Sequence, residues 1–143
     1  MPELTTIRTS LEVGFSGGEL PERLRGYRGK EWRSIAASVL FPYEDEQFDV
    51  VMLEGSVVGK ESVREAHRVL RTGGRCVFVV PQKTARQGGY ELGDVHALVR
   101  DGFNIVDVER PKWWRFGIGG RTLFICAQKK AWKARSNTYR PYV

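Results

Sequence analysis

The sequence predicts an α/β protein with a mostly parallel sheet, covered by helices and completed by an antiparallel C-terminal strand. Two observations carry this prediction. Apolar runs of strand length recur along the chain, and amphipathic helical segments separate some of them. The 143 residues fit one domain, long enough to bury a core without disulfides or metals.

The first expected strand covers residues 5–13 and runs into the segment LEVGFSGG, residues 11–18. An apolar run followed by an acidic residue and glycines fits a nucleotide-cradling loop, but it also fits an ordinary turn. A weaker strand candidate follows at residues 31–37. The residues of this region alone do not decide between the two interpretations.

A βαβ unit is expected next. The strand FDVVML (48–53) precedes a helix within residues 61–74, and RCVFVV (75–80) is the second strand. The helix is expected to end at Gly73 and Gly74, because glycine readily adopts the left-handed conformation of a helix C-cap. The unit implies parallel pairing with a right-handed crossover. The apolar positions of the helix follow helical spacing: Val63, Ala66, Val69 and Leu70.

The C-terminal half predicts a second helix within residues 90–102, ended by Gly102. Strands at 103–109 and 121–128 follow, and the connection RPKWWRFGIGG is compatible with an antiparallel return. The buried stripe of the second helix is expected to be Leu92, Val95, Leu98 and Val99.

The composition, 41% hydrophobic and 28% charged, is that of a soluble globular protein. No apolar stretch approaches the ~20 residues of a membrane-spanning helix and no leader opens the chain, so we expect a cytoplasmic protein without membrane contact. Cys76 and Cys126 lie inside apolar runs and are expected to be buried. Neither has partners at ligand spacing, so no metal site is expected.

The net charge of +6 is concentrated near the C-terminus. We therefore divide the chain into a domain at 1–130 and a basic aromatic tail at 131–143. Cations also alternate with aromatic rings in the preceding loop, which makes Lys112, Trp113, Trp114 and Arg115 candidates for contact with a partner. Such residues suit nucleic-acid binding or a protein interface, and the tryptophans also suit the edge of a core.

A central segment gives the first indication of a family. FPYEDEQFDVVMLEGSVVGKESVREAHRVLRTGGRCVFVVP resembles class I S-adenosylmethionine-dependent methyltransferases, especially the small-molecule type. The matching elements are Phe41-Pro42-Tyr43, the strand start Phe48-Asp49-Val50-Val51, and residues 68–74, where Thr72 replaces the usual proline. The order of elements over 90–128 also matches. The resemblance implies a Rossmann-like methyltransferase fold over most of residues 5–130.

The resemblance also gives LEVGFSGG a function. The family's cofactor loop has the pattern acidic-x-Gly-x-Gly-x-Gly, and Glu12, Gly14 and Gly18 match it, with Ser16 in place of the middle glycine. Glycines there let the backbone approach the methionine part of the cofactor. S-adenosylmethionine is therefore the implied cofactor.

Departures from the family pattern imply an impaired pocket and a reduced N-terminal half. Residues 18–48 are too few for the usual two strands and two helices, so one βα unit is expected to be missing. The position that in the family often carries an aspartate near the adenine amino group is Ala37, with Ser38 beside it. Glu31 lies at the start of its expected strand, whereas the family's ribose-binding acid lies at the end.

Many members of this family transfer the methyl group mainly by aligning the acceptor with the sulfonium, so no universal base is required. Glu54, just beyond strand 48–53, is a candidate general base or acceptor-orienting group, with a solvated loop carboxylate as the alternative. His67 and His96 lie on expected helices and are interpreted as structural or surface residues.

Three functions stay open at this point. The chain is a compact methyltransferase, a non-catalytic scaffold that binds a protein, or an RNA-binding derivative that uses the basic aromatic segments. Because a chain of this length has little material for an acceptor pocket, a protein partner or a homo-oligomer is the expected way to complete one.

Overall fold

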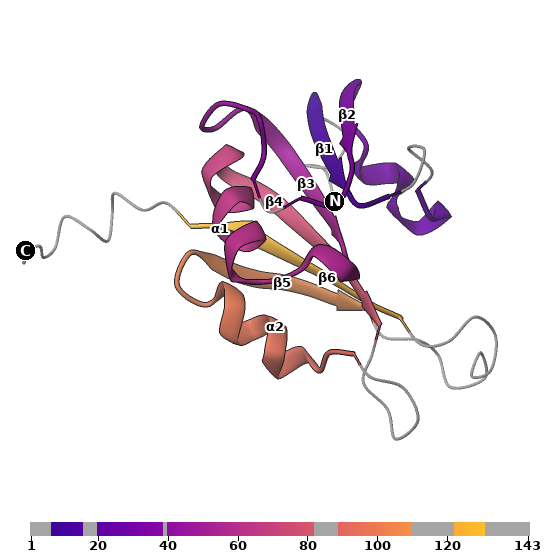
Figure 1. Cartoon of the computed structure of the whole chain (residues 1–143), viewed down its shortest axis with the longest axis vertical. Helices are drawn as coiled ribbons and strands as arrows, with labels where there is room; N and C mark the ends of the chain where they lie inside the picture. Colours follow the sequence, from indigo (N-terminus) through magenta and orange to yellow (C-terminus); the bar gives the residue numbers. More distant parts are fainter. Residues whose placement is uncertain (1–6, 16–19, 39, 82–88, 110–121, 131–143) are drawn as a thin grey trace, which may run out of the picture.

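A mixed sheet of six strands forms the centre of the computed structural model, which describes residues 7–15, 20–38, 40–81, 89–109 and 122–130 (Figure 1). The strand order is β2-β1-β3-β4-β6-β5. The first four of these are parallel, and β6 lies antiparallel between β4 and β5. The predicted fold class is confirmed. The strands are β1 (Thr9–Val13), β2 (Glu31–Ile35), β3 (Phe48–Glu54), β4 (Leu70–Pro81), β5 (Phe103–Glu109) and β6 (Thr122–Lys129).

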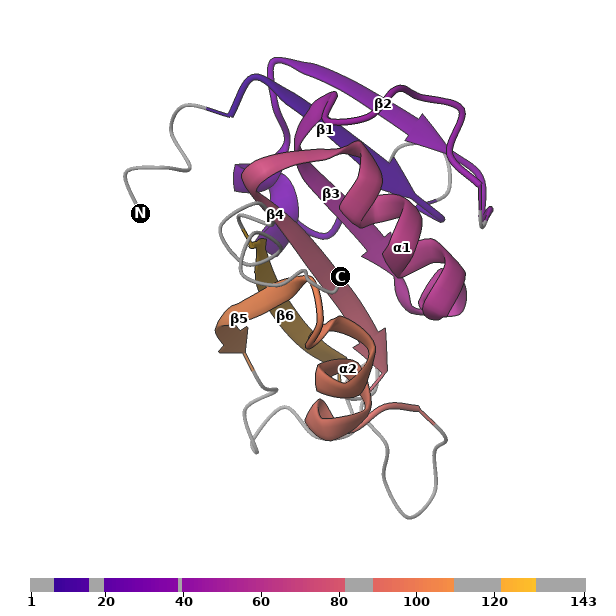
Figure 2. The same ribbon diagram turned by 90° about the vertical axis from the view of Figure 1, so that its left-hand side faces the viewer.

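The helices cover the two faces of the sheet unequally. The α-helices α1 (Lys60–Val69) and α2 (Leu92–Val99) lie on one face (Figure 2). Among the described residues, the other face is covered by the short 3₁₀ helix η3 (Glu22–Tyr27), which buries Leu24 against the sheet. A further 3₁₀ turn, η4 (Gly55–Val57), follows β3 directly. No helix in the described part of the chain is long and apolar enough to cross a bilayer.

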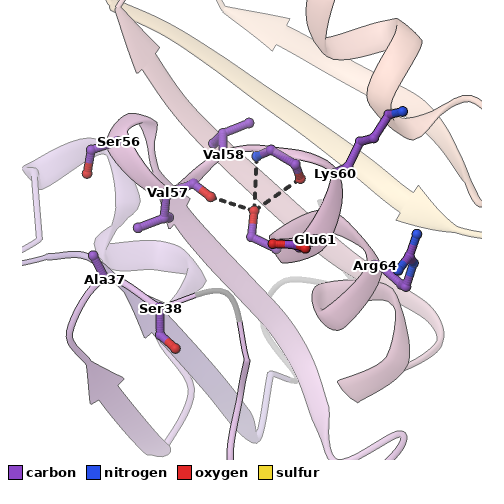
Figure 3. A pocket seen from close by; sticks show the side chains of 10 residues that line it. Ala37, Ser38, Ser56, Val57, Val58, Lys60, Glu61 and Arg64 are labelled. Atoms are coloured by element: carbon purple, nitrogen blue, oxygen red, sulfur yellow. Dashed lines mark hydrogen bonds between the residues drawn. The ribbon is translucent and has the colours of Figure 1, made fainter.

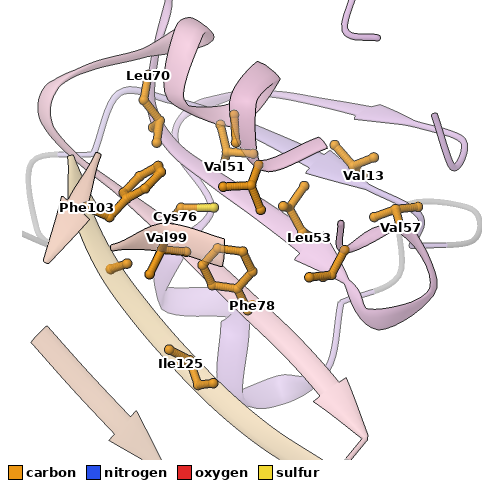
Figure 4. Close-up of a cluster of buried hydrophobic side chains, with 14 of the residues drawn as sticks. Val13, Val51, Leu53, Val57, Leu70, Cys76, Phe78, Val99, Phe103 and Ile125 are labelled. Atoms are coloured by element: carbon orange, nitrogen blue, oxygen red, sulfur yellow. The ribbon is translucent and has the colours of Figure 1, made fainter. Parts of the chain in front are cut away.

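Continuous apolar runs form the central strands because both faces of the sheet are covered. In β3, Val51 and Leu53 pack toward α1, whereas Val50 and Met52 pack toward η3. Figure 4 shows the larger of the two clusters, in which Phe78 lies among side chains from the neighbouring strands and helices. Val95 and Val99 of α2 are buried, and Leu92 and Leu98 are half-buried against the same core, as the spacing predicts.

Arg68 fastens the turn before β3 to helix α1. Its guanidinium donates to the carbonyl oxygens of Phe41 (2.9 Å) and Tyr43 (2.8 Å) and pairs with Glu65 and Asp45 at 2.9 Å. The Glu65 carboxylate in turn accepts the N–H of Phe41 at 2.9 Å. Two segments of the family-like motif are thus joined through one side chain.

Asp49 joins the start of β1 to β3. Its carboxylate accepts the backbone N–H groups of Arg8 (2.9 Å) and Thr9 (3.2 Å) and pairs with Arg71 at 2.5 Å. Burial alone would raise the pKa of Asp49, but these donors outweigh it and hold the pKa below its ordinary value. The aspartate of the FDVV segment therefore has a structural role at the amino edge of the sheet.

The N-terminal half is short, as expected. Between β1 and β3, the described residues contain one strand and one 3₁₀ helix and no α-helix. β2 takes the edge position beside β1, and Glu31 stands at its start, exposed. The expected strands at 5–13 and 31–37 correspond to the shorter β1 and β2.

The predicted end of the first helix is wrong. α1 ends at Val69, and Leu70 is already extended, because its side chain is fully buried and it pairs with Phe48 of β3. Gly73 does adopt a left-handed conformation, with φ at +85°, but inside the irregular first half of β4. The second helix likewise ends at Val99, before Gly102.

Candidate functional site

An open hollow of about 780 Å³ lies at the carboxyl edge of the sheet (Figure 3). It separates the residues that follow β2 from η4 and the first turn of α1. Ligands of open α/β sheets bind at this edge, and the volume is within the range of small-molecule sites. The lining residues are Ala37, Ser38, Ser56, Val57, Val58, Gly59, Lys60, Glu61, Ser62 and Arg64.

Ser62 shapes one wall of the hollow. The buried hydroxyl donates to the Val57 carbonyl at 2.5 Å and accepts the N–H of Gly59 at 3.0 Å (Figure 3). These bonds fix the turn between η4 and α1. Ser38, on the opposite side, uses its hydroxyl to bond the backbone of Leu40. Val57 and Val58 supply the apolar part of the wall.

Gly14 places the end of β1 against that wall. Its φ is +91°, and its N–H donates to the Ile35 carbonyl at 3.0 Å. A Cβ at this position would lie 3.2 Å from Glu54 Cβ and 3.4 Å from Val57 Cγ1. Both the left-handed backbone and the close approach therefore favour glycine. The turn that the sequence associated with a cofactor loop adjoins a residue that lines the hollow.

Glu54 ends β3 at the same edge, where the sequence placed it. Its half-buried carboxylate caps η4 by accepting the Ser56 N–H at 2.9 Å, and it also accepts the Ser56 hydroxyl. In this arrangement one oxygen, Oε1, makes both bonds. The Glu54 carboxylate therefore stabilises the start of η4, whatever chemical role it also has.

Glu12 lies on the other face of the sheet from α1, fully buried. Arg28 forms a bidentate pair with it, with Nε 2.5 Å from Oε2 and Nη2 2.8 Å from Oε1. The hydrogen bond to Glu12 is the main reason that the pKa of Arg28 is raised. The guanidinium also stacks on Trp32, 3.9 Å from the ring centroid.

The structure brings some of the predicted residues together and separates others. Gly14, Ala37, Ser38 and Glu54 gather at the carboxyl edge, with Ala37 and Ser38 lining the hollow. Glu12 is directed to the opposite face and is already paired with a cation of the chain itself. The candidates outside the described residues are Ser16, Gly18, Lys112, Trp113, Trp114, Arg115 and the tail at 131–143.

Sequence reasoning missed Arg28, and it also missed the residues of η4 and α1 that line the hollow. Arg28 lies 16 positions from Glu12, in a segment of ordinary basic and turn-forming residues. The one available signal was chemical, since a carboxylate inside an apolar strand needs a cation or several donors.

The histidines are not in the hollow. His67 is half-buried and packs edge-to-face on Phe103, with ring centroids 5.3 Å apart. Burial and the nearby charge of Lys129 lower the pKa of His67 to about 4. His96 is exposed on α2.

The thiols of Cys76 and Cys126 are buried, as expected, and burial raises the pKa of both. The described residues contain no group of three or more histidine, cysteine or acidic side chains able to hold a metal ion.

Comparison with known proteins finds similarity to methyltransferases. Residues 21–78 match the family model described as a methyltransferase domain. No curated protein matches the sequence significantly.

Three solved structures illustrate the similarity. A 1,6-didemethyltoxoflavin-N1-methyltransferase of Burkholderia thailandensis, with S-adenosylhomocysteine bound, is 20% identical with a TM-score of 0.63, over 90% of this chain and 74% of that one. A SAM-dependent methyltransferase of Methanosarcina mazei is 13% identical with a TM-score of 0.60, over 85% and 92%. A chain of a Haloferax volcanii complex containing the Trm112 methyltransferase activator is 13% identical with a TM-score of 0.64, over 87% and 83%.

The fold is that of a Rossmann-like methyltransferase. The match to the methyltransferase-domain model and the shared fold together confirm the resemblance to class I S-adenosylmethionine-dependent methyltransferases.

Proposed function

We propose that this chain binds S-adenosylmethionine in the carboxyl-edge hollow and promotes methyl transfer to an acceptor that reaches the same edge. The observation that carries the proposal is the hollow itself, which adjoins the Gly14 turn. The ligand of the related Burkholderia enzyme, S-adenosylhomocysteine, supports this class of cofactor. The acceptor approaches from solvent, because the hollow is open.

The residues present fit such a molecule in shape. The hollow combines an apolar wall, from Val57 and Val58, with hydroxyl groups of Ser38 and Ser56, which suits a ligand that has both a ring system and polar groups. The missing Cβ of Gly14 keeps the end of β1 close to this wall. When bound, S-adenosylmethionine supplies a methyl group on a sulfonium, which a lone pair of the acceptor attacks.

The charges fit less well, and we therefore propose weak binding. Ala37 offers no carboxylate where the family often has one, and the Glu12 carboxylate is engaged by Arg28. Each charge-assisted contact that is not made weakens binding by roughly 1.5–3 kcal/mol. Two missing contacts would move a micromolar ligand toward the millimolar range.

In this proposal Glu54 is the acceptor-orienting residue. It stands at the end of β3 beside Gly14, and its Oε2 has no hydrogen bond among those found in the described part of the chain. An oxygen so placed can accept a proton or a hydrogen bond from an acceptor amine or hydroxyl. Alignment would supply the larger part of the rate enhancement.

A scaffold that binds a protein partner is the second candidate. The observation that favours it is the Glu12–Arg28 pair, which uses the cofactor-loop carboxylate to stabilise the fold. The Haloferax structure, a complex that contains an activator protein, supports this candidate.

Calorimetric titration with S-adenosylmethionine and S-adenosylhomocysteine separates the two candidates. Because Ala37 is exposed at the rim of the hollow, Ala37→Asp should add the carboxylate without disturbing the core. We expect weak binding by the wild type and binding about tenfold tighter by Ala37→Asp. Ala37→Asn is the matched control and should gain much less. An absence of heat and of thermal shift for both the wild type and Ala37→Asp would favour the scaffold.

A further inference from the structure

β2 is an edge strand of the described sheet, beside β1. Among the described residues it pairs only with β1, in a regular register without a bulge over all five positions. Four of its five residues are exposed, including Trp32, whose exposed fraction of 40% is large for an apolar ring. Regular edge strands without a bulge or a proline can pair with another strand.

The ladder with β1 shows which backbone groups are directed outward. Glu31 donates its N–H to the Arg8 carbonyl at 2.8 Å, and Ile35 accepts the N–H of Gly14 at 3.0 Å. In a parallel ladder alternate residues bond to the same neighbour, so Glu31, Arg33 and Ile35 bond to β1. The N–H and C=O groups of Trp32 and Ser34 are therefore directed away from the sheet.

β2 carries opposite charges, Glu31 and Arg33, on either side of Trp32. We propose that the partner is a second copy of this chain, paired antiparallel through β2 about a two-fold axis at Trp32. This register places Glu31 of each copy opposite Arg33 of the other, and the two Trp32 residues opposite one another. Opposite charges and aromatic pairs directly across an antiparallel ladder are stabilising, and like charges are destabilising.

Neighbouring registers are unfavourable for the same reason. An axis at Arg33 would place two arginines opposite one another, and an axis at Glu31 would place two glutamates. Trp32 also has its hydrogen-bonding groups directed outward, so an axis at this residue gives a hydrogen-bonded pair in which each copy donates to and accepts from the other. Backbone geometry and charge thus favour the same axis, as a closed two-fold interface requires.

The single chain protects this edge in a way that is reversible. Arg33 Nη1 donates to the Trp32 carbonyl at 3.2 Å, across an exposed surface. In the pair, the N–H of Trp32 from the second copy takes this carbonyl, and the Arg33 guanidinium turns to Glu31 of that copy. The same side chain therefore covers the edge in the monomer and contributes an ion pair in the dimer.

A charge-swap series measured by sedimentation velocity tests the proposal. We expect the wild type to dimerise as its concentration rises. Glu31→Arg and Arg33→Glu each place like charges opposite one another twice, and each should weaken association by about tenfold or more. The double variant, Glu31→Arg with Arg33→Glu, restores opposite charges and should recover dimerisation. Ser34→Pro, which removes an outward N–H, should also weaken it.

The outcomes are decisive in both directions. Restoration by the double variant supports the register about Trp32. A wild type that stays monomeric at high concentration overturns the proposal, and so do single variants that associate as the wild type does. A dimer whose single variants are weakened but whose double variant is not restored also overturns it. Circular dichroism of each variant checks that the exposed substitutions leave the fold intact.

Discussion

The buried carboxylate of Glu12 is held by Arg28 through two hydrogen bonds, and Arg28 is held in turn by Trp32. This relationship ties the segment that follows η3 to the end of β1, where the glycine turn begins. An ion pair between a fully buried acid and a partly exposed base thus links these two segments.

Arg28→Ala should destabilise the protein by about 3 kcal/mol, because it leaves the buried carboxylate without its counter-ion. Urea denaturation measures the free energy of unfolding. Arg25→Ala is the matched control, since Arg25 is exposed on η3, and it should change stability by less than about 0.5 kcal/mol. Combining Arg28→Ala with Glu12→Gln should recover part of the loss. If Arg28→Ala and Arg25→Ala were equally stable, the Glu12–Arg28 pair would not have the stabilising role described here.

Arg68→Ala should destabilise the protein by about 2–3 kcal/mol, since the carbonyls of Phe41 and Tyr43 lose their donor and Glu65 loses its ion pair. Arg68→Lys should recover only part, because an ammonium cannot reproduce the forked contacts. Amide hydrogen exchange should show faster exchange in residues 43–47. The exposed Arg64 of the same helix provides the comparison, and Arg64→Ala is expected to leave exchange there unchanged.

Gly14→Ala should cost about 1–3 kcal/mol, from the left-handed backbone together with crowding against Glu54. Two other glycines separate these causes. Gly73 also has a positive φ but open space around it, so Gly73→Ala should cost only the backbone part. Gly26 has neither constraint, and Gly26→Ala should be nearly neutral. The loss of unfolding free energy should be largest for Gly14→Ala, smaller for Gly73→Ala and smallest for Gly26→Ala. Denaturation of the three variants measures it, and the reverse order would refute the explanation.

His67 should make stability fall between pH 6.5 and pH 4. Its pKa is about 4 in the folded chain against 6.5 in the unfolded chain, so the unfolded chain binds more protons in this window. The contribution is fully present above pH 6.5 and is lost as the pH falls toward 4. Between pH 7 and pH 5 the wild type should lose about 1–2 kcal/mol more than His67→Gln. Parallel losses in the two proteins would exclude this role for His67.

The sequence predicted which segments form strands and helices better than it predicted the residues at which they end and the side-chain contacts between them. The apolar runs of β3 and β4 were recognisable because strands buried on both faces need continuous apolar residues. The end of α1 was mispredicted because two glycines gave a local stop signal, whereas burial of Leu70 ended the helix earlier. Tertiary packing outweighs a local preference in such cases.

The location of part of the candidate site could also be predicted, but not all of its side-chain contacts. Gly14, Ala37, Ser38 and Glu54 could be placed at one edge, because the carboxyl ends of parallel strands share an edge. The pairing of Glu12 with Arg28 could not be predicted, since it depends on how η3 and the following residues cross β1. Contacts of this kind are set by three-dimensional packing, and no periodic pattern in the sequence records them.

The antiparallel direction of β6 has a practical consequence for experiments with this protein. Gln128 pairs with Arg75 near the start of the regular part of β4, so Lys130 lies at the edge of the sheet opposite the hollow. A surface or affinity matrix attached at Lys130 would therefore hold the molecule by the edge of the sheet opposite the hollow. The hollow would then face the solution, and small molecules could be screened against the immobilised protein without obstruction by the attachment.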